Sequence, residues 1–567
     1  MMLKYSKKVF LISLIISFFA FTIKAASDDP VKAKNGMVVS ASELASKVGV
    51  QILQKGGNAV DAAVAVGFAL AVTYPAAGNI GGGGFMVIHL SDGRDVTIDY
   101  REQAPLKAFR EMYLNSSGNY LPELSQTGET SSGVPGSVAG LIYALEKYGT
   151  MKLSDVIKYA INLAEDGFPL SENLAQSFNW SKKHFDKYES TKKVFTKNNA
   201  DFAEGEIFKQ PDLANTLKQI KEKGRDGFYK GDVAKLIIEQ MEKSGGYITF
   251  EDLESYQPKE RVPVTGTYKD FKIVSMGPPS SGGIALIEML NILENFNFKK
   301  KDWGSSRYIH TLAEAMKYTY ADRTFHLGDE DFYPVPKKFL LSKEYANQIA
   351  AKITGVAVPS SQITHGNPNQ LIESKETTHY SVCDKFGNAV STTTTINSSF
   401  GSKVIVDGAG FFLNNEMDDF SAKPNTPNQF GLLGGEANSI QPGKRMLSSM
   451  TPTIVLKDGK PFIVVGSPGG STIMTVVLQV ILNVIDFKMD IKQAIDMPKI
   501  HHQWFPDEID YEPFGLSSDV IANLISMGQN IGTQQSLGRV EGIVIDNSKA
   551  IFYGASDPRG DGLAKGY

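Results

Sequence analysis

The stretch TTHYSVCDKFGNAVSTTTTIN, residues 377–397, places two hydroxyl-rich runs on either side of a polar, glycine-containing turn. This pattern predicts an antiparallel hairpin centred on Phe386, in which residues whose numbers sum to 772 face each other and Thr395 lies opposite Thr377. Cross-strand partners have Cβ atoms about 5 Å apart. Because side chains alternate between the two faces, Thr377, Thr393, Thr395 and Asn397 are expected on one face. A slip of one residue would break this pairing.

Two explanations fit so many threonines. Threonine is β-branched, so strand propensity alone could account for them. The other explanation is chemical, because Thr377 directly follows a polar stretch, residues 359–376, that we expect to be a flexible, exposed loop. Cleavage before Thr377 would put a hydroxyl and a free α-amine on one residue, and the amine, with a pKa of about 7.7–8.0, could act as the base for its own nucleophile. The residues alone leave both explanations open.

The N-terminus predicts export. Lys4, Lys7 and Lys8 precede an apolar run of 15 residues, 9–23, which is shorter than the roughly 20 residues that span a bilayer as a helix. Small residues follow, so residues 1–26 are interpreted as a cleaved secretory signal peptide and the mature protein as periplasmic or secreted, with no membrane span. An uncleaved anchor is the alternative.

Composition narrows the function classes. The chain has 567 residues, 42% hydrophobic and 21% charged, which is typical of a globular protein with a large core. Its formal net charge of −4 and lack of a basic block argue against nucleic acid as a partner. Cys383 is the sole cysteine, so no intrachain disulfide can form, and we interpret it as a small buried hydrophobe. The histidines show no metal-site spacing, so no metal is expected in the chemistry.

The rest of the chain predicts a mixture of helices and strands. Two helices, separated at Gly56-Gly57, are expected before the glycine run 81–84. This run lacks the Lys-Ser/Thr of a phosphate-binding loop and leads into a strand, so it indicates close backbone packing. A hairpin turn is expected at Asp92-Gly93. Further expected elements are amphipathic helices over 145–355, a strand over 271–276, a turn and helix at GPPSSGG (277–283), an apolar helix over 472–485 and a polar tail over 557–567.

The hairpin sequence closely resembles the signature of the γ-glutamyltranspeptidase family of N-terminal-nucleophile hydrolases. The resemblance extends over nearly the whole mature chain, through GGNAVDAAVAV (56–66), DYREQAP (99–105), ADRTFHLGD (321–329), NNEMDDFSAKP (414–424), MLSSMTPTIV (446–455), GSPGGS (466–471) and YGASDPR (553–559). It implies an α/β fold of the αββα type, with two stacked sheets between helical layers. It also implies self-cleavage between Glu376 and Thr377 into a large subunit, 27–376, and a small catalytic subunit, 377–567, which stay together as one domain.

The resemblance also implies roles for individual residues. Thr377 would be the nucleophile for cleavage and catalysis, and Thr395 would orient it. Arg101, Ser448 and Ser449 would bind the donor's α-carboxylate, Asn397, Glu416 and Asp419 its α-ammonium, and Gly469 and Gly470 would form the oxyanion hole. Phe430 matches a lid position where many bacterial members have tyrosine, which leaves the balance of hydrolysis and transfer open. Without the resemblance, an ordinary ion pair of Arg101 with Glu102 or Asp99 would be the preferred interpretation.

The implied activity is that of a γ-glutamyltransferase and glutathione hydrolase. The γ-glutamyl group of glutathione or a related donor would form an ester with Thr377 and pass to water, an amino acid or a dipeptide. This implied reaction needs no organic cofactor. One alternative is a relative with another donor, such as a cephalosporin acylase or a poly-γ-glutamate depolymerase. Another is an exported binding protein that stays a single chain.

Overall fold

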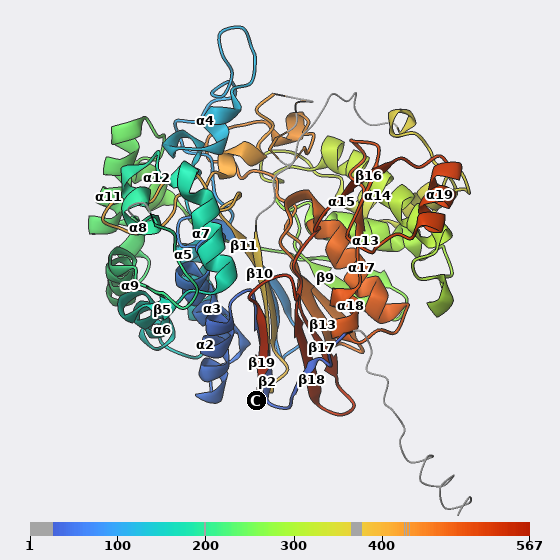
Figure 1. Cartoon of the computed structure of the whole chain (residues 1–567), viewed down its shortest axis with the longest axis horizontal. Coiled ribbons are helices and arrows are strands. Elements are labelled where there is room, and N and C mark those ends of the chain that lie inside the picture. The colour runs from blue at the N-terminus through green and yellow to red at the C-terminus, as the bar shows by residue number, and fades with distance from the viewer. Residues whose placement is uncertain (1–26, 198–199, 364–376, 424–425, 427, 430) are drawn as a thin grey trace, which may run out of the picture.

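The computed structural model describes residues 27–567 except 198–199, 364–376, 424–425, 427 and 430. Two seven-stranded sheets stack face to face between two layers of helices (Figure 1). The expected αββα architecture is therefore confirmed. The expected signal peptide, Glu376 and Phe430 lie outside the described residues.

The first sheet contains the hairpin at its centre. Strand β10 (Thr378–Asp384) pairs with β11 (Ala389–Thr395), and every pair in the register, from Thr378–Thr394 to Cys383–Ala389, sums to 772 as predicted. The complete strand order is β19 (Leu563–Gly566), β2 (Gly36–Ser40), β10, β11, β3 (Gly83–His89), β4 (Asp95–Asp99) and β7 (Lys259–Arg261). The hairpin is thus flanked on both sides by strands that precede it by more than 280 residues.

The second sheet packs against the inner face of the first. Its order is β1 (Val31–Ala33), β18 (Ile551–Ser556), β17 (Glu541–Asp546), β13 (Lys460–Gly466), β12 (Thr453–Lys457), β9 (Phe271–Ser275) and β8 (Val264–Tyr268). Two small sheets lie outside this pair: β14 (Ile500–His501), β15 (Ile509–Tyr511) and β16 (Ile531–Gln534), and β5 (Phe168–Pro169) with β6 (Ile207–Phe208).

Helices cover both outer faces. Those on the side of the first sheet are α2 (Glu43–Gln54), α3 (Ala59–Thr73), α5 (Ser137–Tyr148), α6 (Leu153–Asp166), α7 (Glu172–Phe185), α8 (Glu189–Phe195), α9 (Pro211–Lys223), α10 (Asp226–Tyr229), α11 (Gly231–Ser244) and α12 (Phe250–Ser255). Those on the other side are α13 (Gly282–Leu293), α14 (Ser306–His326), α15 (Lys337–Leu340), α16 (Lys343–Ala350), α17 (Ile473–Ile485), α18 (Ile491–Asp496) and α19 (Ser518–Ser526). The short α4 (Pro122–Gln126) lies near the end of the sheets. Among the described residues, no helix combines the length and apolar character needed to cross a bilayer.

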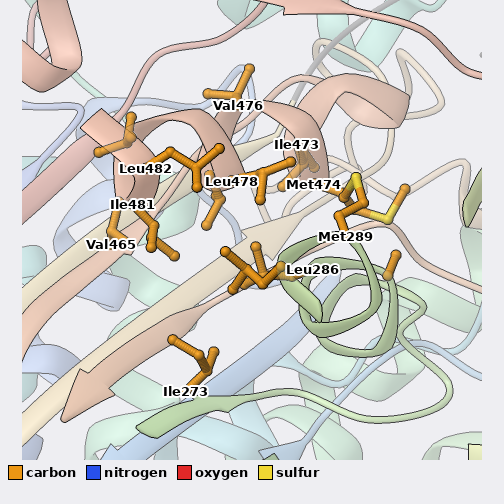
Figure 2. Packing of buried hydrophobic residues seen from close by; sticks show 14 of the residues in the cluster. Ile273, Leu286, Met289, Val465, Ile473, Met474, Val476, Leu478, Ile481 and Leu482 are labelled. Carbon is orange, nitrogen blue, oxygen red and sulfur yellow. The ribbon is translucent and has the colours of Figure 1, made fainter. Parts of the chain in front are cut away.

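The apolar helix α17 fixes the second sheet to its helical layer. Figure 2 shows Leu478 and Ile481 of α17 beside Val465 of β13, with Leu286 and Met289 of α13 nearby. All of these side chains are at most 1% exposed. Fully burying one such side chain contributes about 1.5–3 kcal/mol. The helix therefore holds the preceding turn, residues 466–472, firmly at the end of β13.

The hydroxyls of the hairpin connect the two sheets. Ser381 Oγ donates to the Glu541 carbonyl at 3.0 Å, and Ser391 Oγ donates to the Val465 carbonyl at 3.1 Å. Ser391 Oγ also accepts from the Thr453 amide. Because these groups are buried, each would be costly if left without a partner. Part of the hydroxyl-rich pattern is therefore explained by hydrogen bonding between the sheets rather than by strand propensity alone.

Other local predictions have mixed outcomes. The turn at Asp92-Gly93 is confirmed between β3 and β4, and the glycine run packs closely, because a Cβ at Gly81 or Gly82 would lie 2.2 Å from a carbonyl oxygen. The polar tail is wrong in part, since residues 563–566 form β19 at the edge of the first sheet. Pairing with β2 stabilises this strand, although its sequence shows no strong strand pattern.

Candidate active site

A small cavity at the end of the stacked sheets brings together most of the residues singled out from the sequence. It is lined by Arg101, Arg323, Thr377, Thr395, Asn397, Glu416, Asp419, Leu432, Ser448, Ser449, Met450, Gly470 and Ile473. These residues come from parts of the chain separated by more than 360 positions. Of the described residues with a predicted role, only Gly469 is not in the lining, and it directly precedes Gly470.

Thr377 and Thr395 lie at the cavity end of the hairpin. Thr377 directly precedes β10, and the register places it beside Thr395, the last residue of β11. Both are buried, and Thr395 Oγ1 accepts the Asn397 amide proton at 2.7 Å. This bond fixes the Thr395 hydroxyl in position beside Thr377.

The Arg101 guanidinium lies among carboxylates. It is 2.5 Å from both Glu416 and Asp419 and 3.6 Å from Glu102. The expected alternative of a simple pair with Glu102 is therefore incomplete. Asp99 contacts Arg101 only by accepting its backbone amide proton, and the Asp99 carboxylate is paired instead with Arg445 and Arg261.

Burial and this cluster shift the pKa values of the three acids. Burial raises the pKa of Asp419 to about 6 and that of Glu102 to about 8, although Arg101 opposes both shifts. Burial also raises the pKa of Glu416 well above its usual range, against the opposing effect of Arg101. Despite its own burial, the pKa of Arg101 is raised by Glu416 and Asp419. The cluster therefore carries less negative charge at neutral pH than three carboxylates would suggest.

Asn397 presents an acceptor to the cavity. Its backbone has a φ of 76°, an uncommon conformation that asparagine tolerates better than most residues. Its Nδ2 donates to the Asn415 carbonyl at 2.9 Å, which directs the amide nitrogen away and leaves Oδ1 as the group able to accept from a bound cation.

Ser448 and Ser449 are held as hydroxyl donors. Ser448 Oγ accepts from the Met450 amide at 3.1 Å, and Ser449 Oγ accepts from Arg323 Nη2 at 3.2 Å. The backbone of Ser448 bonds to Pro279 and Ser281 in the GPPSSGG turn, which therefore supports the serine pair. An oxygen that already accepts a hydrogen bond can direct its own proton toward a bound anion.

The glycine turn lies between the end of β13 and the start of α17. Gly469 and Gly470 have φ values of 137° and 54°, and a Cβ at Gly469 would lie 2.4 Å from Thr472 Oγ1. A short 3₁₀ turn, Gly470–Thr472, and then α17 follow. Backbone amides at such a helix start favour negative charge.

Two further residues, neither of them in the cavity lining, have structural explanations. Asp418 accepts hydrogen bonds from Tyr120, Ser125 and the Gln429 amide, so its carboxylate stabilises the surrounding turns. Cys383 is buried at the far end of β10, and burial raises the pKa of its thiol well above the usual range, so an inert thiol is supported.

Sequence reasoning missed Arg323. It lies near the end of α14 within the quoted motif ADRTFHLGD, but no role was assigned to it. The motif was the available indication, although a helical position alone does not show that the side chain reaches a site built by distant segments. Among the described residues, no group of three or more His, Cys, Asp or Glu side chains is arranged to hold a metal ion.

Comparison with known proteins identifies the family. The model of the gamma-glutamyltranspeptidase family matches residues 45–567. The chain is 49% identical to the glutathione hydrolase proenzyme of Escherichia coli K12 over 541 residues, covering 95% of this chain and 93% of that protein. The chain therefore belongs to the γ-glutamyltranspeptidase family, and the predicted family resemblance is confirmed.

Solved structures show the same fold. The cephalosporin acylase from Bacillus halodurans is similar with a TM-score of 0.86 at 28% identity, covering 97% of this chain and 98% of that one. A chain of Helicobacter pylori gamma-glutamyltranspeptidase is 50% identical with a TM-score of 0.57, covering 60% of this chain and 96% of that one. The protein is thus a self-processing enzyme of the N-terminal-nucleophile type.

Proposed function

We propose that the protein cleaves the γ-glutamyl amide bond of glutathione and related donors, with Thr377 as the nucleophile. One observation carries the proposal: a single cavity joins Thr377 to both acidic and hydroxyl side chains able to recognise an amino acid. The 49% identity to a glutathione hydrolase proenzyme supports the same donor class.

The first step is maturation. Cleavage of the Glu376–Thr377 bond gives Thr377 a free α-amine, which takes the proton from its own hydroxyl. The hydroxyl oxygen then attacks the γ-carbonyl of the donor while Thr395 orients it. The amine passes the proton to the leaving amine, which for glutathione is cysteinylglycine. The γ-glutamyl ester on Thr377 is released by water as glutamate or transferred to an amino acid or dipeptide.

The oxyanion formed during attack faces the glycine turn. The amides of Gly469 and Gly470 are proposed to donate to it, because glycine permits close approach and the helix start favours negative charge. Loss of one such donor typically costs about 3–4 kcal/mol of transition-state stabilisation.

The α-substituents of the donor fix its orientation. Arg101, Ser448 and Ser449 would bind the α-carboxylate, and Asn397, Glu416 and Asp419 the α-ammonium. Arg101 contacts Glu416 and Asp419 directly, so the donor's carboxylate and ammonium would join an existing network of opposite charges. This arrangement rewards donors that carry both groups.

The two cleavage products are proposed to remain a heterodimer, comprising a large piece from about residue 27 and a small piece of 191 residues. Arg101 belongs to the large piece and Thr377 to the small one, so both pieces are needed for the cavity. We also propose that the protein is exported, on the basis of the basic and apolar N-terminal pattern.

A donor panel tests the proposal. Purified, matured protein is incubated with γ-glutamyl-p-nitroanilide and glutaryl-p-nitroanilide, which differ only in the α-amine. Faster release of p-nitroaniline from the γ-glutamyl compound is expected. A preference for the glutaryl compound would instead support an acylase, the second candidate favoured by the structural similarity to cephalosporin acylase.

A further inference from the structure

Arg323 is the second guanidinium in the cavity, and its surroundings differ from those of Arg101. Arg101 contacts two carboxylates at 2.5 Å, and its Nε faces the Met446 carbonyl. Arg323 is also buried, but its hydrogen bonds go to two hydroxyls, Ser281 Oγ from Nε at 3.1 Å and Ser449 Oγ from Nη2 at 3.2 Å. Among the described residues, no carboxylate lies within ion-pairing distance of Arg323, although the charge of Asp419, which is paired with Arg101, also acts on it.

A buried cation without a carboxylate partner is costly unless an anion joins it. Arg323 lines the same cavity as Thr377, so the anionic part of a bound donor can supply the missing charge. Arg101, by comparison, already has its charge balanced by Glu416 and Asp419.

The hydrogen bond to Ser449 gives Arg323 a second effect. Because Ser449 Oγ accepts from the guanidinium, its own proton is free to donate into the cavity. On the other side, Ser281 Oγ accepts from Arg323 and donates to the Ser448 carbonyl at 2.7 Å. One side chain therefore holds both serines of the pair in place.

We propose that Arg323 is a specificity-determining residue that holds Ser449 as a hydroxyl donor and offers the donor's α-carboxylate a positive charge that no carboxylate of the protein contacts directly. This inference rests on the proposed γ-glutamyl activity. It assigns a task to helix α14, which lies in the large piece and contacts the small piece through Ser449.

The test compares two donors that differ only in the α-carboxylate. These are γ-glutamyl-p-nitroanilide and 4-aminobutanoyl-p-nitroanilide, which keeps the amine but lacks the carboxylate. Arg323→Met is expected to lower kcat/KM for the first donor by about 10- to 100-fold, mostly through KM, because a hydrogen-bonded charge is lost. The loss for the second donor should be no more than about threefold, because that donor has no group for Arg323 to bind.

Controls separate positioning from structural support. Arg307→Met makes the same chemical change at an exposed arginine on the same helix and should leave both donors unaffected. In a Ser449→Ala background the effect of Arg323→Met should shrink, since part of it acts through that hydroxyl. If Arg323→Met does not yield folded protein, Arg323→Lys takes its place. Lysine keeps the charge but cannot form the fork of hydrogen bonds, so kcat/KM should again fall more for γ-glutamyl-p-nitroanilide than for 4-aminobutanoyl-p-nitroanilide.

Equal losses on the two donors would overturn the proposal and make Arg323 a purely structural tie. A wild-type protein that releases no p-nitroaniline from the γ-glutamyl donor would instead overturn the proposed function. The two failures are therefore distinguishable.

Discussion

Thr377 combines two tasks that separate residues perform in many hydrolases. Its hydroxyl is the proposed nucleophile, and its α-amine, released by cleavage, is the proposed base. In the cavity around it, Thr395 is proposed to orient the nucleophile, and Arg101 with its carboxylates provides charged groups. No charged triad is then required.

Thr377→Ala removes the hydroxyl needed for both maturation and catalysis. The variant is expected to remain one undivided chain and to lose at least about a thousandfold in activity. Intact mass under denaturing conditions, after incubation at neutral pH, measures the first effect. Two fragments that meet at the Glu376–Thr377 bond, together with turnover of the donor, would contradict the assignment.

Asp419 predicts a pH dependence that is specific to donors with an α-amine. Its pKa is raised to about 6 by burial, so the carboxyl is neutral below this pH and charged above it. Because recognition of an ammonium group needs the charged form, kcat/KM for γ-glutamyl-p-nitroanilide should fall as the pH decreases through about 6.

The glutaryl donor provides the control for this profile, since it lacks the amine but shares the Thr377 chemistry. The ratio of kcat/KM for the γ-glutamyl donor to kcat/KM for the glutaryl donor should therefore fall as the pH is lowered through about 6. A ratio that stays constant from pH 5 to 8 would show that Asp419 does not read the amine.

At the scale of elements, helix α14 supports the cavity from outside the hairpin. Arg323 bonds to Ser449, and Tyr320, one turn earlier, donates to the carbonyl of Ser471 beside the glycine turn. Two turns of the small piece, one carrying the serines and one the glycines, thus depend on a single helix of the large piece.

Tyr320→Phe should impair the glycine turn without removing any group that touches the donor. A net hydrogen bond contributes about 1 kcal/mol, so kcat is expected to fall about fivefold. KM should change little, because the residues proposed to bind the α-substituents are left in place. A change confined to KM, measured with γ-glutamyl-p-nitroanilide, would contradict this role.

The elements differ in how far the sequence could predict them. The hairpin register followed from local information, because a short turn and alternation along two adjacent strands determine the pairing. The contact between Arg323 and Ser449 joins residues 126 positions apart, and β19 pairs with β2 from the opposite end of the chain. Such contacts depend on how the layers stack, which local patterns do not encode. The stacking itself came from the family resemblance.

At the scale of the whole molecule, cleavage before Thr377 would leave two interleaved pieces. The hairpin β10–β11 belongs to the small piece, but its neighbours β2 and β3 belong to the large one. In the second sheet, β12 of the small piece pairs with β9 of the large piece. Separating the pieces would therefore break hydrogen-bonded ladders in both sheets.

The matured protein should behave as one cooperative unit. Specific activity is expected to stay constant on dilution from micromolar to about nanomolar concentration, because dissociation would require unfolding. Urea unfolding followed by fluorescence and by circular dichroism should give one coincident transition. Activity that declines on dilution and returns on concentration would show that the pieces separate while folded.

The interleaved strands also bear on how such a protein could arise in evolution. A protein made by fusing two ancestral genes usually keeps a complete core in each half. Here a break at position 377 leaves neither half with a complete sheet, since each sheet takes strands from both sides of that point. Position 377 is therefore not a junction between two segments that each hold a complete core of their own.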